Sequence, residues 1–317
     1  MSTALAPDVK WGVLGAGWLV QTATGAAIHR AAGAELYATG ARDITRAEAT
    51  GAVRAYDSYQ DVVDDPEVEA VYICLSNEAH LPWIRACISA GKHVLCEKPM
   101  VLTETDAASV CTEADDAGLL LVEAVWSRWH PRMRRIVDLA SSGALGEITD
   151  YLATFTFDGV AADNYRLSPD HGGGALYDVG IYPLHAMFAL LPAVEFVTAI
   201  EVDQVRNEQG VDLTTSADLT WGGATRASIT GSFIMPESQL LTVTGTEGEI
   251  RVADNAAFAT YQKPTELWIG GHLERFPSTD AYQVMFEEVN ARIRGANGWL
   301  LPHRDSIRVA RTVDSLL

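Results

Sequence analysis

The sequence predicts two domains: a parallel, doubly wound α/β domain, followed by an α+β domain built on a large, mainly antiparallel sheet. In the first third of the chain, short apolar strands alternate with helical segments, which is typical of right-handed βαβ units. After Trp126 the strands become longer, and most alternate apolar with polar residues. The length of 317 residues suits about two domains. We place them at residues 1–124 and 125–317.

Each element of the first domain follows from a local pattern. Thr45, with Glu48 three residues later, has the pattern of a capping box, and Gly91 suits the position after a helix end. Residues 57–63 are expected to be helical or irregular. The apolar runs predict strands at residues 11–14, 35–39, 70–75, 93–96 and 119–122, and the segments between them predict helices at 18–30, 45–55, 78–90 and 104–117.

The second domain is expected to be dominated by strands. The turn at residues 221–224, Trp-Gly-Gly-Ala, joins two consecutive strands and indicates antiparallel pairing. The expected strands are 149–157, 195–205, 213–221, 225–234, 240–244, 249–253 and 266–269. The expected helices are 133–142, 175–191 and two more within 280–317.

Composition excludes several classes of partner. The net charge of −19 argues against nucleic acid and anionic membranes, and no apolar run is long enough to span a bilayer. The cysteines, Cys74, Cys87, Cys96 and Cys111, lie in apolar or helical contexts without a Cys-x-x-Cys motif. We therefore expect reduced thiols and, because the first residues do not resemble a signal peptide, a cytoplasmic protein.

A glycine-rich turn near the amino terminus predicts a dinucleotide site. Gly15 and Gly17 follow the first strand, and Trp18 and Leu19 open the next helix. In this context the first glycine permits a tight turn, and the second lets the backbone approach a pyrophosphate at the helix N-terminus. A plain tight turn is the alternative. Val20 stands where Gly or Ala is usual, so helix–strand packing is expected to be looser there.

The end of the second strand predicts which dinucleotide binds. Arg42 stands where a carboxylate would otherwise take the ribose 2′-hydroxyl, and Arg46 follows one helical turn later. Two guanidinium groups suit a 2′-phosphate, which favours NADP over NAD. Asp43 keeps NAD open, and Arg42 as a solvated residue at a helix start is the alternative to a phosphate contact.

The segment Cys96-Glu97-Lys98-Pro99 predicts a positioned cation at the sheet edge where ligands bind. Lys98 follows a predicted parallel strand and precedes a proline, so a mobile surface lysine is the weaker interpretation. Beside a nicotinamide, a lysine can donate to a substrate hydroxyl and favour the oxyanion that develops as hydride leaves. No His, Cys or carboxylate spacing in the chain resembles a metal site.

A second group of candidate residues follows the glycine run at residues 172–174. Asp178 and Tyr182 are four residues apart and share one helix face, with His185 near the same stripe. If Lys98 lies beside Tyr182, the pair can work as an acid/base, because a cation lowers the pKa of a phenol. A domain-interface tyrosine is the alternative, and His185 is best interpreted as a core histidine. Asp178 could contact the substrate or orient the lysine.

Taken together, these motifs resemble the Gfo/Idh/MocA oxidoreductases, and among them the branch of dimeric dihydrodiol dehydrogenases, NADP-dependent xylose dehydrogenases and glucose–fructose oxidoreductase. The resemblance runs nearly end to end, although Leu75-Ser76 replaces a common Thr-Pro. The residues that carry it are Gly15 and Gly17, and the segments 76–80, 91–99, 123–131, 172–182 and 301–306.

The resemblance implies a Rossmann-type domain, and a second domain whose open-faced sheet is used for dimerisation or higher homo-oligomers. It implies that Lys98 is catalytic and that Tyr182 is the acid/base. Trp126, Phe155 and Asp178 would line the substrate pocket, Arg42 would meet the adenine ribose phosphate, and Ser76, Asn77, His80 and Glu97 would lie along the cofactor.

The activity expected from the resemblance is NADP-dependent hydride transfer to or from a sugar, a polyol or a cyclic diol. Two alternatives stay open from the sequence. One is a non-catalytic dinucleotide sensor, which would not need Lys98, Asp178 and Tyr182. The other is an oxidoreductase that does not release its nicotinamide between turnovers.

Overall fold

The computed structural model describes residues 7–221, 225–253, 255–258 and 262–317. Two compact units form the chain. The first comprises Met1–Met100, Thr105–Trp126 and Asp280–His303, and the second comprises Val101–Glu104, Ser127–Thr279 and Arg304–Leu317. The first unit thus takes in residues 280–303, which the expected boundary at 124/125 assigned to the second domain.

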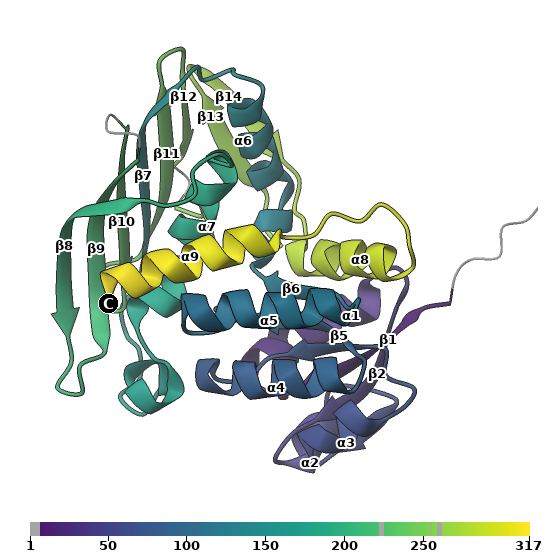
Figure 1. The fold of residues 1–317 in the computed structure, drawn as a ribbon. Coiled ribbons are helices and arrows are strands. Elements are labelled where there is room, and N and C mark those ends of the chain that lie inside the picture. The colour runs from purple at the N-terminus through teal and green to yellow at the C-terminus, as the bar shows by residue number, and fades with distance from the viewer. Residues whose placement is uncertain (1–6, 222–224, 254, 259–261) are drawn as a thin grey trace, which may run out of the picture. The chain divides into compact units, whose positions relative to one another are not determined.

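The first unit contains the predicted doubly wound parallel sheet (Figure 1). Its strand order is β3-β2-β1-β4-β5-β6, and all of its paired strands are parallel. This order reverses beside β1, which is the position where such sheets bind dinucleotides. The strands are β1 (Val9–Leu14), β2 (Ala34–Gly40), β3 (Arg54–Tyr56), β4 (Ala70–Ile73), β5 (His93–Glu97) and β6 (Leu121–Ala124).

The helices of this unit occupy the predicted segments, with one correction. Residues 45–55 were expected to form one helix capped by Thr45, but the helix is short, and Arg54–Tyr56 forms the edge strand β3. The cap is Asp43, whose carboxylate accepts from the Thr45 backbone N–H at 3.0 Å. The helical segments are η1 (Val20–Thr24), α1 (Gly25–Arg30), α2 (Ile44–Glu48), α3 (Tyr59–Asp64), α4 (Asn77–Ser89) and α5 (Glu104–Asp116), of which η1 is a π-helix.

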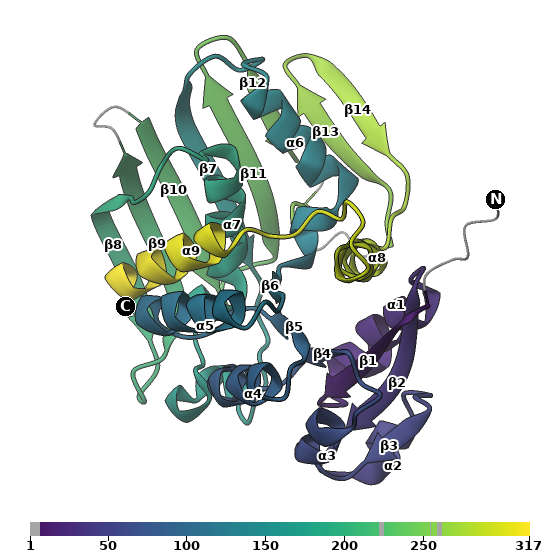
Figure 2. The ribbon, with the colours of Figure 1, turned by 45° about the vertical axis from the view of Figure 1, so that its right-hand side comes forward.

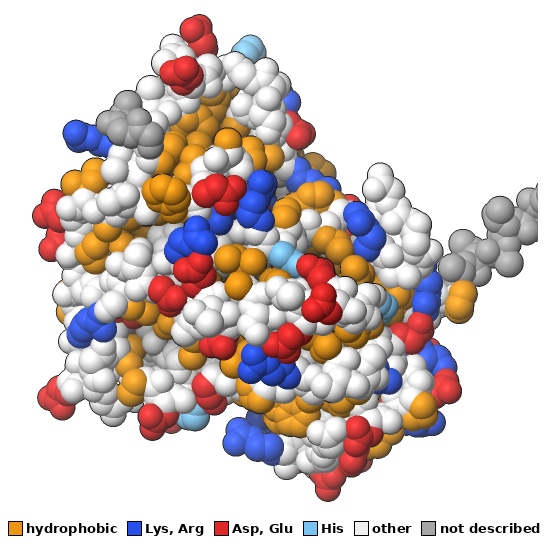
Figure 3. All heavy atoms as spheres, viewed as in Figure 1, with side chains coloured by type: hydrophobic (Ala, Val, Ile, Leu, Met, Phe, Trp, Pro, Cys, Tyr) orange, Lys and Arg blue, Asp and Glu red, His pale blue; other side chains and the backbone are white. Residues whose placement is uncertain are grey.

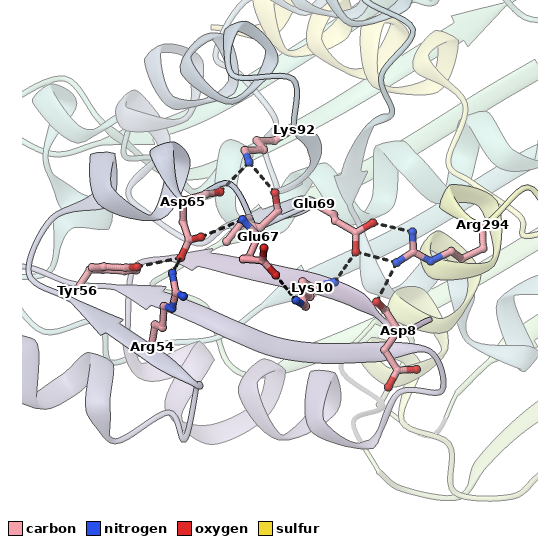
Figure 4. A network of polar contacts seen from close by, with 10 residues as sticks. Asp8, Lys10, Arg54, Tyr56, Asp65, Glu67, Glu69, Lys92 and Arg294 are labelled. Atoms are coloured by element: carbon pink, nitrogen blue, oxygen red, sulfur yellow. Dashed lines mark hydrogen bonds and ion pairs between the residues drawn. The ribbon is translucent and has the colours of Figure 1, made fainter. Parts of the chain in front are cut away.

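Helix α8 (Ala281–Ile293) joins the first unit through specific polar contacts. Asn290 accepts from the indole of Trp11 at 2.8 Å, and Arg294, just past the helix, donates to both oxygens of Glu69 at 2.6 and 2.8 Å (Figure 4). Farther along the same network, Asp65 accepts from Arg54 and Tyr56. The Trp11–Asn290 and Glu69–Arg294 pairs are far apart in sequence, which is why the pattern of strands and helices did not predict them.

The second unit is built on the predicted sheet, which has eight strands in the order β14-β13-β12-β11-β7-β10-β9-β8 (Figure 2). All pairs are antiparallel except β7 with β10. The β9–β10 pairing confirms the antiparallel prediction, although residues 222–224 of the turn itself lie outside the described residues. The strands are β7 (Ile148–Thr156), β8 (Thr198–Arg206), β9 (Asp212–Trp221), β10 (Thr225–Ser232), β11 (Ser238–Gly245), β12 (Glu249–Val252), β13 (Thr265–Ile269) and β14 (His272–Phe276), of which β14 was not predicted.

Helices of the second unit lie on one side of this sheet (Figure 2). They are α6 (Pro131–Ser141), α7 (Ile181–Leu190) and α9 (His303–Leu316), and all of α9 except His303 belongs to this unit. A π-helical turn, η5 (Leu176–Gly180), leads into α7, and the 3-10 turns are η2 (Trp126–Trp129), η3 (Tyr165–Leu167) and η4 (Pro169–His171). Strands of the sheet also carry exposed apolar side chains, namely Leu152, Ile200, Val202, Val205 and Leu240.

Charge is dispersed on the face that Figure 3 shows, where acidic side chains are interspersed with Lys and Arg. Within the described residues, none of the helices has the length and apolar character that crossing a membrane requires. The four cysteines are free thiols, and three of them are buried.

Candidate active site

The turn after β1 is shaped by Gly15. Its φ is +97°, and a Cβ there would lie 2.4 Å from the Cys74 carbonyl oxygen at the end of β4, so only glycine fits. Its N–H donates to the Gly40 carbonyl of β2 at 2.9 Å. Gly17 differs, because a Cβ on it would meet no atom within 4 Å. The loop is therefore closed against the sheet at Gly15 and open above Gly17, as a pyrophosphate site requires.

The residues after this loop take an unusual helical form. Trp18 is 77% exposed, Leu19 is half-buried, and Val20 is buried at the start of the π-helix η1. A Cβ on Gly25 would lie 2.8 Å from the Val20 carbonyl oxygen, to which Gly25 donates. A π-helical turn is wider than an α-helical one, and it accommodates the bulk of Val20 at this position.

Both predicted arginines are exposed at the end of β2. Arg42 lies two residues after the strand, and Arg46 lies in α2, whose backbone is tied to η1 by a hydrogen bond from Gln21 to the Arg46 carbonyl at 2.8 Å. Asp43 is already engaged, since its Oδ1 accepts from the N–H and the hydroxyl of Thr45. These hydrogen bonds lower the pKa of Asp43.

Lys98 lies immediately after β5 and is half-buried. Beneath it, the buried Glu97 carboxylate accepts from the Tyr72 hydroxyl at 2.6 Å and from the Lys98 backbone N–H at 3.3 Å. Burial raises the pKa of Glu97 to about 7, against the opposing effects of the Tyr72 hydrogen bond and the Lys98 charge. The backbone N–H of the candidate lysine is therefore held by a buried carboxyl group that is itself hydrogen-bonded.

Two buried side chains fix the loop that carries Lys98. His80, which was predicted to lie along the cofactor, has a side chain with no exposed surface. Its Nδ1 lies 2.8 Å from the Pro99 carbonyl and its Nε2 lies 3.2 Å from the Leu75 carbonyl. Glu123, which was not assigned a separate role from the sequence, accepts from the Met100 N–H at 3.0 Å. Both residues hold the backbone that directly follows Lys98.

The other predicted cofactor and pocket residues of the first unit are mostly engaged within the protein. The Ser76 hydroxyl donates to Glu78 at 2.7 Å, and Asn77 is buried at the start of α4. Trp126, expected to line the substrate pocket, is largely buried and stacks on Tyr282 with ring centroids 4.9 Å apart.

The second unit brings together three of the predicted residues. Asp178 lies in η5, and Tyr182 lies one turn later in α7, with only 7% of its surface exposed. The Tyr182 ring packs against Phe155 of β7, centroid to centroid 5.5 Å, and against Phe258 at 6.1 Å. His185 is fully buried, as its interpretation as a core histidine predicted.

Sequence reasoning missed Arg166, which forms an ion pair with Asp178 at 2.8 Å. The glycine run at residues 172–174 was interpreted as a close backbone approach, and the structure shows what is approached. A Cβ on Gly173 would lie 2.4 Å from the Arg166 carbonyl oxygen, and the Gly174 N–H donates to that oxygen at 3.0 Å. The glycines thus bring the loop at residues 164–168 onto the start of η5.

The predicted residues therefore fall into two groups. The first unit carries the glycine loop, the exposed arginines and Lys98. The second carries Asp178 and Tyr182 with the aromatic ring of Phe155. The first group offers the geometry of a dinucleotide site with an adjacent cation, and the second offers a phenol and a carboxylate suited to moving a proton.

Family models match both parts of the chain. Residues 9–124 match the oxidoreductase family with an NAD-binding Rossmann fold, GFO_IDH_MocA, and residues 133–251 match the GFO/IDH/MocA C-terminal domain. D-xylose 1-dehydrogenase (NADP(+)) 2 of Haloferax volcanii is 34% identical over 294 residues, which cover 89% of this chain and 88% of that protein.

The chain belongs to the Gfo/Idh/MocA oxidoreductase family. This Gfo/Idh/MocA protein is also 30% identical to the mouse (Mus musculus) trans-1,2-dihydrobenzene-1,2-diol dehydrogenase over 274 residues, which cover 85% of this chain and 80% of that protein. Its fold matches KijD10, a 3-ketoreductase from Actinomadura kijaniata solved with NADP and TDP-benzene, with a TM-score of 0.84 at 26% identity. That match covers 98% of this chain and 97% of the other.

Proposed function

We propose that this oxidoreductase uses NADP and transfers a hydride between the nicotinamide and a carbinol or carbonyl carbon of a sugar, a polyol or a cyclic diol. The observation that carries the proposal is the pairing of an open glycine loop with a fixed Lys98 in a chain of this family. The names of the relatives support it: an NADP-dependent xylose dehydrogenase, a dihydrodiol dehydrogenase and a ketoreductase solved with NADP.

The residues of the first unit suit NADP. Gly15 and Gly17 would hold the pyrophosphate, Trp18 and Leu19 would flank it, and Ser76, Asn77 and Glu97 would lie nearby. Exposed Arg42 and Arg46 would receive the 2′-phosphate. Asp43, the residue that would favour NAD, caps α2 with its carboxylate, and this engagement supports the choice of NADP.

We assign the chemistry to Lys98, Tyr182 and Asp178. When bound, the nicotinamide supplies or accepts the hydride. Tyr182 donates or removes the proton on the substrate oxygen, and Lys98 stabilises the negative charge that develops on that oxygen. Asp178 orients the substrate by accepting a hydroxyl hydrogen bond, and Phe155 provides an apolar surface. Trp126 contributes to the pocket only through its small exposed edge.

We further propose that the protein is cytoplasmic and forms a homodimer or a higher homo-oligomer. The exposed Leu152, Ile200, Val202 and Leu240 on the strands of the second unit support self-association through that sheet. Sedimentation at equilibrium measures this, and a monomer at micromolar concentration would contradict it.

A matrix of cofactors and substrates tests the proposed function. We expect the purified protein to reduce NADP faster than NAD with at least one aldose, polyol or trans-diol of a broad panel. Binding of NADPH without turnover of any panel member would favour the non-catalytic sensor. Stoichiometric dinucleotide retained through gel filtration would favour an enzyme that does not release its nicotinamide.

The choice of cofactor has its own test. Arg42→Ala should weaken the binding of NADPH at least about tenfold and leave that of NADH nearly unchanged, because only NADPH loses a phosphate contact. Arg85→Ala, which removes an exposed arginine of α4 paired with Glu113, is the control. Equal losses for the two cofactors would remove the phosphate contact from the proposal.

A further inference from the structure

Arg166 is paired with Asp178, which lies four residues before the proposed acid/base Tyr182. Its Nε donates to the Asp178 carboxylate at 2.8 Å, and 32% of its side chain is exposed. Its guanidinium carbon lies 4.8 Å from the centroid of the Tyr165 ring, which supports one face of the planar group. Among described side chains, Asp178 is the one to which this guanidinium donates a hydrogen bond.

The backbone holds Arg166 in this place through several contacts. The Asn164 side chain accepts from the Arg166 N–H at 3.0 Å, and the Gly174 N–H donates to the Arg166 carbonyl at 3.0 Å. The Arg166 carbonyl oxygen packs so closely against the Gly173 backbone that a Cβ on Gly173 would not fit. Arg166 is thus fixed at both its backbone and its side chain, which a solvated surface arginine does not need.

Charge links Arg166 to Tyr182. Burial works to lower the pKa of Arg166, but the charge of Asp178, followed by Tyr165, the Asp178 hydrogen bond and Tyr182, raises it. The Coulomb interaction is mutual, so a cation that is favoured by the charge on Tyr182 also favours the phenolate form of Tyr182. Asp178, four residues before Tyr182, carries a like charge to the phenolate, and the buried His185 follows Tyr182 by three residues on α7.

We propose that Arg166 is a positioning residue for the acid/base: it holds the Asp178 carboxylate in place and provides a positive charge that favours ionisation of Tyr182. This inference rests on the proposed function only for its effect on turnover. Through its ion pair, Arg166 offsets the negative charge of Asp178, which would otherwise oppose the phenolate.

An NMR titration tests the proposal without turnover. Tyrosine labelled with ¹³C at Cζ reports ionisation, and Tyr182→Phe assigns the resonance. In Arg166→Gln we expect Tyr182 to ionise about half to one pH unit higher than in the wild type, and in Arg166→Lys, which keeps the charge, by less than half of that shift. Two results would contradict the proposal. One is a Tyr182 titration midpoint that is the same in the wild type and in Arg166→Gln, and the other is a Tyr182 side chain that stays neutral in both proteins until they unfold.

Arg135→Gln is the matched control. It removes an arginine of the same unit that pairs with a carboxylate, Glu274, at 3.1 Å on α6 and β14. We expect it to leave the Tyr182 titration unchanged. Thermal melts of the variants separate this effect from a loss of folding, since Arg166→Lys keeps both the charge and a donor.

Turnover gives a second readout. With a substrate from the panel, the rising limb of kcat against pH in the oxidation direction should move to higher pH in Arg166→Gln, with the KM for NADP unchanged. A uniform loss of kcat at every pH would indicate a structural role and overturn the inference. If the wild type turns over no substrate, the proposed function fails, while the NMR titration still decides the role of Arg166.

Discussion

The two halves of the set of candidate residues, one in each unit, use the same kinds of element in opposite ways. Each has a glycine-rich segment followed by a π-helical turn, and each has a largely buried carboxylate beside the proposed catalytic group. A Cβ on Gly17 would meet open space, whereas a Cβ on Gly173 would clash with the carbonyl oxygens of Arg166 and Ser168. Glu97 accepts from a neutral tyrosine, whereas Asp178 is paired with a guanidinium.

This comparison shows that a glycine run alone does not identify a ligand site. Glycines of the first half leave room for a ligand, and those of the second let the chain pack onto itself and present Arg166. The two carboxylates, Glu97 and Asp178, also differ in their hydrogen-bond partners. Without a cation as its hydrogen-bond partner, buried Glu97 holds its proton more tightly, while the Arg166 ion pair favours the charged form of Asp178.

The largest expected effect is on the glycine segment of the second unit, where the backbone packs closely at Gly173. Gly173→Ala places a Cβ 2.4 Å from the Arg166 carbonyl and 2.7 Å from the Ser168 carbonyl, and both are backbone atoms that cannot turn away. We expect the free energy of unfolding to fall by about 3 kcal/mol, the upper range for overpacking. Denaturant melts measure it. Gly271→Ala is the control, since nothing lies within 4 Å of its Cβ position, and a cost for Gly173→Ala no greater than that of the control would break the comparison.

The carboxylates should differ in their effect on stability against pH. Burial raises the pKa of Glu97 to about 7 in the folded protein, while the unfolded chain loses this proton near the ordinary glutamate pKa of 4.5. Between these values the unfolded state binds fewer protons, so stability falls as pH rises, by up to about 3 kcal/mol from this group.

Glu97→Gln should flatten the dependence on pH in that window, as measured by denaturant melts at a series of pH values. Glu48→Gln, on the exposed part of α2, is the control and should leave the curve as it is in the wild type. A slope in Glu97→Gln that equals the wild-type slope would show that Glu97 does not hold its proton in this way.

A smaller effect is expected at the glycine loop of the first unit, which is open above Gly17. It is an effect on the affinity for the cofactor rather than on stability. Gly17→Ala adds a methyl group into open space, so unfolding should change by no more than about 0.5 kcal/mol. Because that space is where we place the pyrophosphate, the affinity for NADPH should fall about tenfold, or about 1.4 kcal/mol. Calorimetric titration measures the affinity, and unchanged binding together with lost stability would reverse the roles of the two glycine segments.

Much of the fold could be predicted from the sequence because local patterns specify it. Apolar runs and helix ends placed most strands and helices, and the motifs led to the family. The errors have physical causes. Thr45 and Asp43 are both good capping residues, and in the structure Asp43 caps the helix by accepting from the Thr45 N–H. Strand β3 is only three residues long and pairs with β2 at those three positions. Residues 54–56 are therefore too few to show an apolar pattern that predicts a strand.

The site was predictable in part for a different reason. Lys98 and Tyr182 belong to motifs that are continuous in sequence, so they could be singled out as candidates, and their roles stay a prediction. Arg166 acts through Asp178, twelve residues away across an irregular loop, and no periodicity connects the two. His80 was predicted to lie along the cofactor from its motif, and its contacts with two backbone carbonyls could not be predicted because Leu75 and Pro99 meet it only in the folded chain.

The most direct test of the account compares kcat of the wild type with that of Lys98→Ala and Tyr182→Phe on the same substrate. We expect each substitution to lower kcat at least about a hundredfold, the scale of a lost acid–base or charge-stabilising group. The matched controls, Lys263→Ala on an exposed loop and Tyr37→Phe in β2, should keep wild-type kcat. Unchanged kcat in either Lys98→Ala or Tyr182→Phe would contradict the claim that the two halves act together on one hydride transfer.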